Sequence, residues 1–147
     1  MAIAIIRLGT ERLDGEGLRL GTVRRPPRGV PRTEYARRNY YDVWLPALAP
    51  SQALLQEWKV MQDERQWKAF TRKFRAEMRQ PDAAKLLDLL AALSHQTDLA
   101  IGCYCKDESR CHRSVLRELL AARGALLAWT DCRAESSSSL REHKNGR

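Results

Sequence analysis

Three of the four cysteines and one of the three histidines of this sequence fall within a single stretch of eleven residues. The stretch reads Cys103-Tyr104-Cys105-Lys106-Asp107-Glu108-Ser109-Arg110-Cys111-His112-Arg113. Thiolates and imidazoles act as nucleophiles, proton carriers and metal ligands, and a guanidinium binds anions through paired hydrogen bonds. Such a concentration of titratable groups predicts a functional site.

The elements around this stretch predict where the site lies. An apolar run from Asp98 to Tyr104 is typical of a short strand, and an amphipathic helix is expected from about Cys111 to Arg123. In parallel α/β sheets, ligands bind beyond the carboxyl ends of the strands. Cys103 and Cys105 would end the strand and Cys111 would open the helix, so all three thiols would lie near that region.

One chemistry for this turn is anion binding. The free N–H groups and the positive end of the dipole at a helix N-terminus attract a phosphate or a carboxylate. Arg113 would add a bidentate clamp.

A second chemistry is nucleophilic catalysis by a thiol. A cysteine at a helix N-terminus near histidine or arginine has a lowered pKa, so Cys111 or Cys103 would be the thiolate and His112 its acid or base. Neighbouring residues on a helix project about 100° apart, so Cys111 and His112 are not paired automatically.

A third chemistry is zinc binding by Cys103, Cys105, Cys111 and His112. The Cys-Xaa-Cys and Cys-His spacings are tighter than the usual gaps of structural zinc sites. Free cysteines are also among the most buried residue types, so each thiol taken singly fits a packing role. The sequence leaves the three chemistries open.

A second candidate region is the loop Arg24-Arg25-Pro26-Pro27-Arg28-Gly29. Its prolines forbid regular structure and hold the arginines in a stiff loop. If the preceding strand lies beside the Cys103 strand, Arg24 and Arg28 would bind an anion together with Arg113. A stiff, exposed basic loop without a ligand fits the same pattern.

The remaining chain alternates strand and helix patterns. Strands are expected at residues 2–6, 17–24, 40–44 and 125–129, and helices at 52–59, from Asp63 and from Pro81. A strand, a helix and a strand in this order imply a parallel sheet. The fold class is therefore expected to be α/β, a single-domain three-layer Rossmann-like fold with a mainly parallel sheet.

The domain is expected to span residues 1–132, and the serine-rich tail at 133–147 is expected to be disordered. Cys132 is interpreted as a spare thiol, and His143 belongs to the tail.

The 147 residues suit one domain, and their net charge of +8 favours an anionic small molecule or nucleic acid as the partner. No apolar run approaches the length of a membrane span. The short apolar start is interpreted as a strand rather than a signal peptide, which predicts a cytoplasmic location and reduced cysteines. The sequence does not determine the oligomeric state.

Several segments resemble the YeaO-like family, also called domain of unknown function 488. They are Gly17-Leu18-Arg19, Arg24, Pro27-Arg28-Gly29, Trp44, Pro50-Ser51, and Phe70 through Phe74 to Glu77. Cys103 with Cys111-His112-Arg113, running into Leu116, resembles the Cys-His-Arg signature of another branch of that family. The resemblance covers about residues 3 to 127 and implies a Rossmann-like α/β fold.

The chain departs from the YeaO-type pattern at a few positions. Val23 and Pro26 stand where the YeaO-type loop has acidic and aromatic residues. Family members can lack Cys105, and YeaO-type members lack Cys111. The resemblance therefore implies neither a zinc site nor a cysteine nucleophile for the whole family.

Two functions from different classes follow from these patterns. The leading hypothesis is an enzyme-like pocket for an anionic ligand, with Arg24, Arg28 and Arg113 as anion-binding residues and Cys111, His112 and Cys103 as the chemical groups. The alternative is a non-catalytic nucleic-acid-binding or interaction module whose cysteines are structural, with or without a zinc ion.

Overall fold

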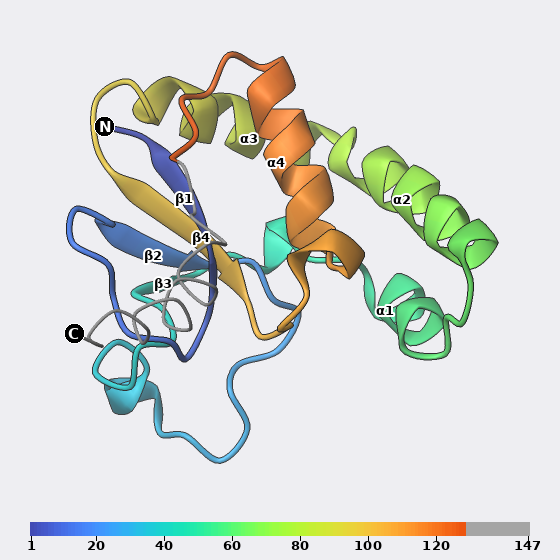
Figure 1. Cartoon of the computed structure of the whole chain (residues 1–147), viewed down its shortest axis with the longest axis horizontal. Helices are drawn as coiled ribbons and strands as arrows, with labels where there is room; N and C mark the ends of the chain where they lie inside the picture. The colour runs from blue at the N-terminus through green and yellow to red at the C-terminus, as the bar shows by residue number, and fades with distance from the viewer. Residues whose placement is uncertain (129–147) are drawn as a thin grey trace, which may run out of the picture.

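The computed structural model describes residues 1–128 (Figure 1). Trp129, Cys132, His143 and the tail at 133–147 lie outside the described residues, as does the predicted domain boundary.

The core of the fold is a parallel sheet of four strands. They are β1 (Ile3–Arg7), β2 (Leu18–Gly21), β3 (Val43–Trp44) and β4 (Leu99–Cys103). Their order in the sheet is β1-β4-β2-β3, so β4 pairs with both β1 and β2. With four α-helices around it, this sheet confirms the predicted Rossmann-like α/β fold. The order also brings the carboxyl ends of β2 and β4 together.

Three of the predicted strands are shorter than the sequence patterns predict. β2 ends at Gly21, and the following residues pass into the proline-containing loop. Tyr41, expected within a strand, instead buries its ring against Gly21, where an added Cβ would lie 2.3 Å from the Tyr41 ring. The predicted last strand is reduced, within the described residues, to a single parallel bridge between Ile3 and Leu127.

The helices lie close to the ranges that the sequence patterns predict. They are α1 (Gln52–Lys59), α2 (Glu64–Met78), α3 (Pro81–Leu93) and α4 (His112–Ala122). The hydroxyl of Ser51 accepts a hydrogen bond from the Leu54 N–H, and Asp63 forms a capping box with Gln66. Within the described residues, no helix combines the length and apolar character needed to cross a membrane. The cytoplasmic location stays a prediction.

The two faces of the sheet are covered differently. Ile3 and Ile5 of β1 point into a core formed with residues of all four α-helices. Ala4 and Ile6 point the other way, into a smaller cluster with Val23, Tyr41 and the flanking tyrosines. In the described part of the chain, the layer on this second face is therefore built from loop segments. These segments also carry residues of the candidate site.

A buried arginine holds these loops together. Arg19 of β2 is fully buried, and its guanidinium is paired with the carboxylate of Glu16. It also donates to the backbone carbonyls of Thr10, Glu11 and Asn39. Because Asn39 immediately precedes Tyr40, this network fixes the loop that brings Tyr40 to the candidate site.

Replacing Arg19 with Ala should lower the free energy of unfolding by about 3–5 kcal/mol, because it leaves the Glu16 carboxylate buried without its partner. Arg37, whose side chain is 74 % exposed and paired with Glu34, is the matched control, and its loss should cost at most about 1 kcal/mol. Chemical denaturation of both variants checks this. Equal small losses would show that the buried pair contributes little.

Candidate active site

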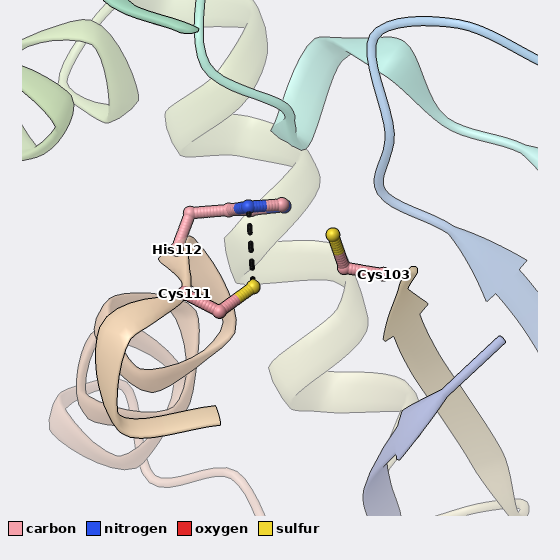
Figure 2. A group of neighbouring side chains, drawn as sticks. All are labelled: Cys103, Cys111 and His112. Carbon is pink, nitrogen blue, oxygen red and sulfur yellow. Dashed lines mark hydrogen bonds between the residues drawn. The ribbon is translucent and has the colours of Figure 1, made fainter. Parts of the chain in front are cut away.

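Three donor side chains converge where β4 ends and α4 begins (Figure 2). Cys103 is the last residue of β4, Cys111 is the N-cap of α4, and His112 is the first residue of that helix. Their sulfur and nitrogen atoms all lie within 4.8 Å of one another. All three side chains are buried, so the predicted cluster is assembled in the protein interior.

Cys111 and His112 face each other although they are neighbours in sequence. The sulfur of Cys111 lies 3.6 Å from Nδ1 of His112 (Figure 2). The 100° separation expected along a helix does not apply, because Cys111 has an extended backbone with φ −119° and ψ 150°. The two side chains can therefore exchange a proton.

A backbone carbonyl fixes the tautomer of His112. Nε2 of His112 lies 2.6 Å from the carbonyl oxygen of Thr22, which follows β2. A carbonyl only accepts hydrogen bonds, so Nε2 must carry a proton and donate it. Nδ1 is then the position that binds or releases a proton beside Cys111. The edge of the imidazole also packs against Phe74 of α2, with ring centroids 5.5 Å apart.

Arg113 is buried behind this pair. It is 2 % exposed, and its guanidinium donates to the carbonyls of Ile6 and Cys105, each at 2.6 Å. Its Nε lies 3.4 Å from the sulfur of Cys111. The sequence suggested that Arg113 binds a ligand directly, but its nitrogens are committed to the protein. Its positive charge instead stabilises a thiolate at Cys111.

The hydrogen bonds of the cluster concentrate negative charge on Cys111. Hydrogen bonds with Cys103 and Cys105 lower the pKa of Cys111 well below its usual range, against the opposing effect of burial. Burial alone would lower the pKa of His112, but its hydrogen bonds with the Cys103 and Cys111 sulfurs raise that pKa to about 10. The hydrogen bonds of Cys103 with Cys105 and Cys111, and then burial, raise the pKa of Cys103. The resulting pair is a Cys111 thiolate beside a His112 imidazolium.

Cys105 lies beside the cluster rather than within it. Its sulfur is 3.6 Å from that of Cys103, but it is not among the three donors that share mutual distances within 4.8 Å. The hydrogen bond to Cys103 lowers the pKa of Cys105, while that to Cys111, together with burial, raises it to about 11. The three-donor group is thus close enough to hold one metal ion, with Cys105 at its margin.

A pocket of about 520 Å³ opens over the cluster. Cys103, Cys105 and His112 line it, whereas Cys111 does not. The sulfurs that a ligand in the pocket can contact are therefore those of Cys103 and Cys105, and Cys111 lies behind them. Cys111 remains a predicted nucleophile, but the thiols that line the pocket are those of Cys103 and Cys105.

Cationic residues surround the pocket. They are Arg24, Arg25, Arg28 and Lys59. Among the described residues that line the pocket there is no Asp or Glu. A negatively charged ligand would therefore find positive potential without a competing carboxylate.

The arginine loop lies beside the Cys103 strand, but its arginines differ in what they can bind. Arg24 donates through Nε to the carbonyl of Pro50 and through Nη2 to those of Pro46 and Ala49, at 2.9–3.1 Å. Arg25 is exposed and reaches Gln52 at 3.3 Å. Arg28 is exposed, and no hydrogen bond or ion pair engages it among the described residues. Arg28 is the arginine freest to bind a ligand.

Sequence reasoning missed several residues of the site. Thr22 was not singled out, although its position one residue beyond β2 places it at the carboxyl edge of the sheet. Tyr104 falls within the cysteine stretch, and Lys59 and Trp58 end α1, but only the fold brings them to the pocket. No spacing in the sequence indicates that α1 closes the pocket.

The fold and the site together define an α/β protein with a Cys-Cys-His cluster at the carboxyl edge of its parallel sheet. The chain belongs to the family described as the Active DUF488-N3 subclade, whose model matches residues 3–124. This confirms the family resemblance. No curated protein and no solved structure matches the sequence.

The lowered pKa of Cys111 predicts an unusual pH dependence of the thiolate absorbance in the metal-free protein. Because the pKa of Cys111 is lowered, the thiolate remains as the pH falls from about 8 to about 6, where an ordinary thiol with a pKa of about 8.5 is protonated. Its ultraviolet absorbance should therefore persist at about pH 6.

The variant Cys111→Ser should lose that absorbance, whereas Cys105→Ser, which removes a thiol of raised pKa, should keep most of it. Absorbance that vanishes between about pH 9 and about pH 8 in the unmodified protein would contradict the ion pair.

Proposed function

We propose that the chain is an enzyme that binds an anionic substrate in this pocket and acts on it with the Cys103, Cys111 and His112 cluster. The observation that carries the proposal is the joint lining of one pocket by cationic residues and by Cys103 and His112, without a carboxylate. The matched family model carries the word active in its description, with which the proposal agrees.

In this proposal, the cationic residues position the substrate and the sulfur of Cys103 attacks it. Arg28, Arg25 and Lys59 hold the anionic group at the pocket mouth. A new bond forms between Cys103 Sγ and an electrophilic atom of the substrate, while the bond to the leaving group breaks and its electron pair departs with that group. The Cys103 proton passes to the Cys111 thiolate, and the leaving group takes a proton from the His112 imidazolium.

His112 and Cys111 have positioning and proton-handling roles in this scheme. The Thr22 carbonyl keeps the Nε2 proton in place, so Nδ1 is the only ring nitrogen that takes up or releases a proton. The positive charge of Arg113 stabilises the negative charge of the buried Cys111 sulfur. The chemistry is therefore confined to the pocket side of the cluster.

Arg28→Ala should weaken the binding of pyrophosphate roughly tenfold or more, since a hydrogen bond to a charged group contributes about 1.5–3 kcal/mol. Arg37→Ala is the matched control, because it removes the same charge from an exposed arginine that does not line the pocket. Isothermal titration calorimetry of both variants measures the effect. If both variants weaken binding equally, or neither does, the pocket is not an anion site.

A second candidate for the chemistry is a zinc ion held by Cys103, Cys111 and His112. Zinc with Zn–S distances of about 2.3 Å and a Zn–N distance of about 2.0–2.1 Å has tetrahedral edges of about 3.8 Å between sulfurs and about 3.6 Å between sulfur and nitrogen. The Cys111 Sγ to His112 Nδ1 distance is 3.6 Å, and the Cys103 to Cys105 sulfur distance is 3.6 Å. The Cys111–His112 separation therefore already matches a zinc site, and the three donor atoms lie within 4.8 Å of one another.

The surroundings of the cluster also fit zinc. A histidine that binds metal commonly donates its other ring N–H to a backbone carbonyl, as His112 does to Thr22. Two of the three donors, Cys103 and His112, line the pocket, so a fourth ligand could reach a zinc from there. Such a zinc would activate water or polarise the substrate. Cys105 is near enough to close the site instead.

Tag-free protein purified under reducing conditions should contain about one zinc per chain if this candidate is correct. The variants Cys103→Ser and Cys111→Ser should each lose most of the metal. His95→Ala is the control. His95 is exposed and hydrogen-bonds the carbonyl of Gly124 rather than any residue of the cluster, so its replacement should leave the zinc content unchanged. If the protein contains no zinc and chelator does not change its count of reactive thiols, the zinc candidate is wrong and the metal-free scheme remains.

A further inference from the structure

The walls of the pocket present aromatic side chains as well as positive charge. Tyr40, Trp58, Phe70 and Tyr104 all line it. The polar atoms of two of these side chains are already engaged, because Tyr104 donates its hydroxyl proton to the carbonyl of Arg25 at 2.9 Å and Trp58 donates its indole N–H to that of Arg110 at 2.7 Å. Their rings therefore offer a ligand mainly apolar surface.

The rings are held in place by their neighbours. Tyr104 packs edge-on against Tyr40, with ring centroids 6.2 Å apart. Phe70 is buried in α2 and stacks between Trp67 and Phe74 at 5.4 and 6.1 Å. Rings fixed in this way lose little freedom when a flat group packs against them.

The lining also excludes some ligand classes. Among the described residues that line the pocket there is no Asn, Gln, Ser, Thr, Asp or Glu. Sugars and other neutral polyols need such side chains to replace their hydrogen bonds to water, so they are poor ligands here. The same absence leaves the edge of a nucleobase without side-chain amides or carboxylates to read it.

We infer that the substrate is a nucleotide-like molecule, in which a phosphate lies at Arg28, Arg25 and Lys59 and a flat base packs on the aromatic wall. This inference rests on the proposed function and names its substrate class. A pocket of about 520 Å³ is within the range of about 300–1,000 Å³ that holds such ligands. Because stacking is tolerant of base identity, the pocket distinguishes the bases only weakly.

The test is calorimetric binding of four probes to the full chain: AMP, UMP, ribose 5-phosphate and adenosine. AMP should bind roughly tenfold or more tightly than ribose 5-phosphate, which lacks the ring, and than adenosine, which lacks the charge. AMP and UMP should differ by less than about tenfold. A 5′-phosphorylated dinucleotide distinguishes the two possible origins of the ligand. If it binds more tightly than AMP, the ligand is the end of a nucleic acid. If it binds equally or more weakly, the ligand is a free nucleotide.

Two variants of Tyr104 separate the ring from its hydroxyl. Tyr104→Leu should weaken AMP binding and leave ribose 5-phosphate binding unchanged, whereas Tyr104→Phe should bind AMP nearly as the unmodified chain does.

The failures of the two proposals are distinguishable. Equal affinity for AMP and ribose 5-phosphate would overturn the nucleotide inference and leave the anion site intact. Equal affinity for AMP and adenosine, or no binding of any phosphate, would overturn the anion site and with it the proposed function.

Discussion

The hydrogen bond from His112 Nε2 to the carbonyl of Thr22 is the constraint on which the rest of the site depends. It ties the first residue of α4 to the end of β2 and leaves Nδ1 to face the sulfur of Cys111. Either chemistry considered for the cluster needs that orientation, since Nδ1 would receive the proton of a thiol or bind a metal ion. Arg113 stabilises the same region by donating hydrogen bonds to the carbonyls of Ile6 and Cys105.

Five arginines near the site divide into two groups with different roles. Arg19, Arg24 and Arg113 direct their guanidiniums at backbone carbonyls and position loops around the site. Arg25 and Arg28 are exposed at the pocket. A net charge of +8 therefore says less about ligand binding than the few cations that remain available. Binding of nucleic acid as an extended partner stays a prediction.

The helices could be predicted well from the sequence because their signals act within one element, as the capping of α1 by Ser51 and of α2 by Asp63 illustrates. The location of the site followed equally from the strand-to-helix turn at Cys103 and Cys111. The roles of the individual side chains did not follow. The extended backbone of Cys111 and the burial of Arg113 are set by tertiary packing, which no residue spacing encodes. The contribution of α1 to the pocket is a long-range contact of the same kind.

Competitive alkylation shows whether the cationic residues of the pocket and the thiol of Cys103 form one site. Reduced, chelator-treated protein is reacted with iodoacetate and with iodoacetamide, and Cys103 is followed by peptide mass spectrometry. The ratio of the two rates at Cys103 should favour the anionic reagent roughly tenfold more than it does for glutathione, and Arg28→Ala should remove that preference. A ratio equal to that of glutathione and unaffected by Arg28→Ala would contradict the account.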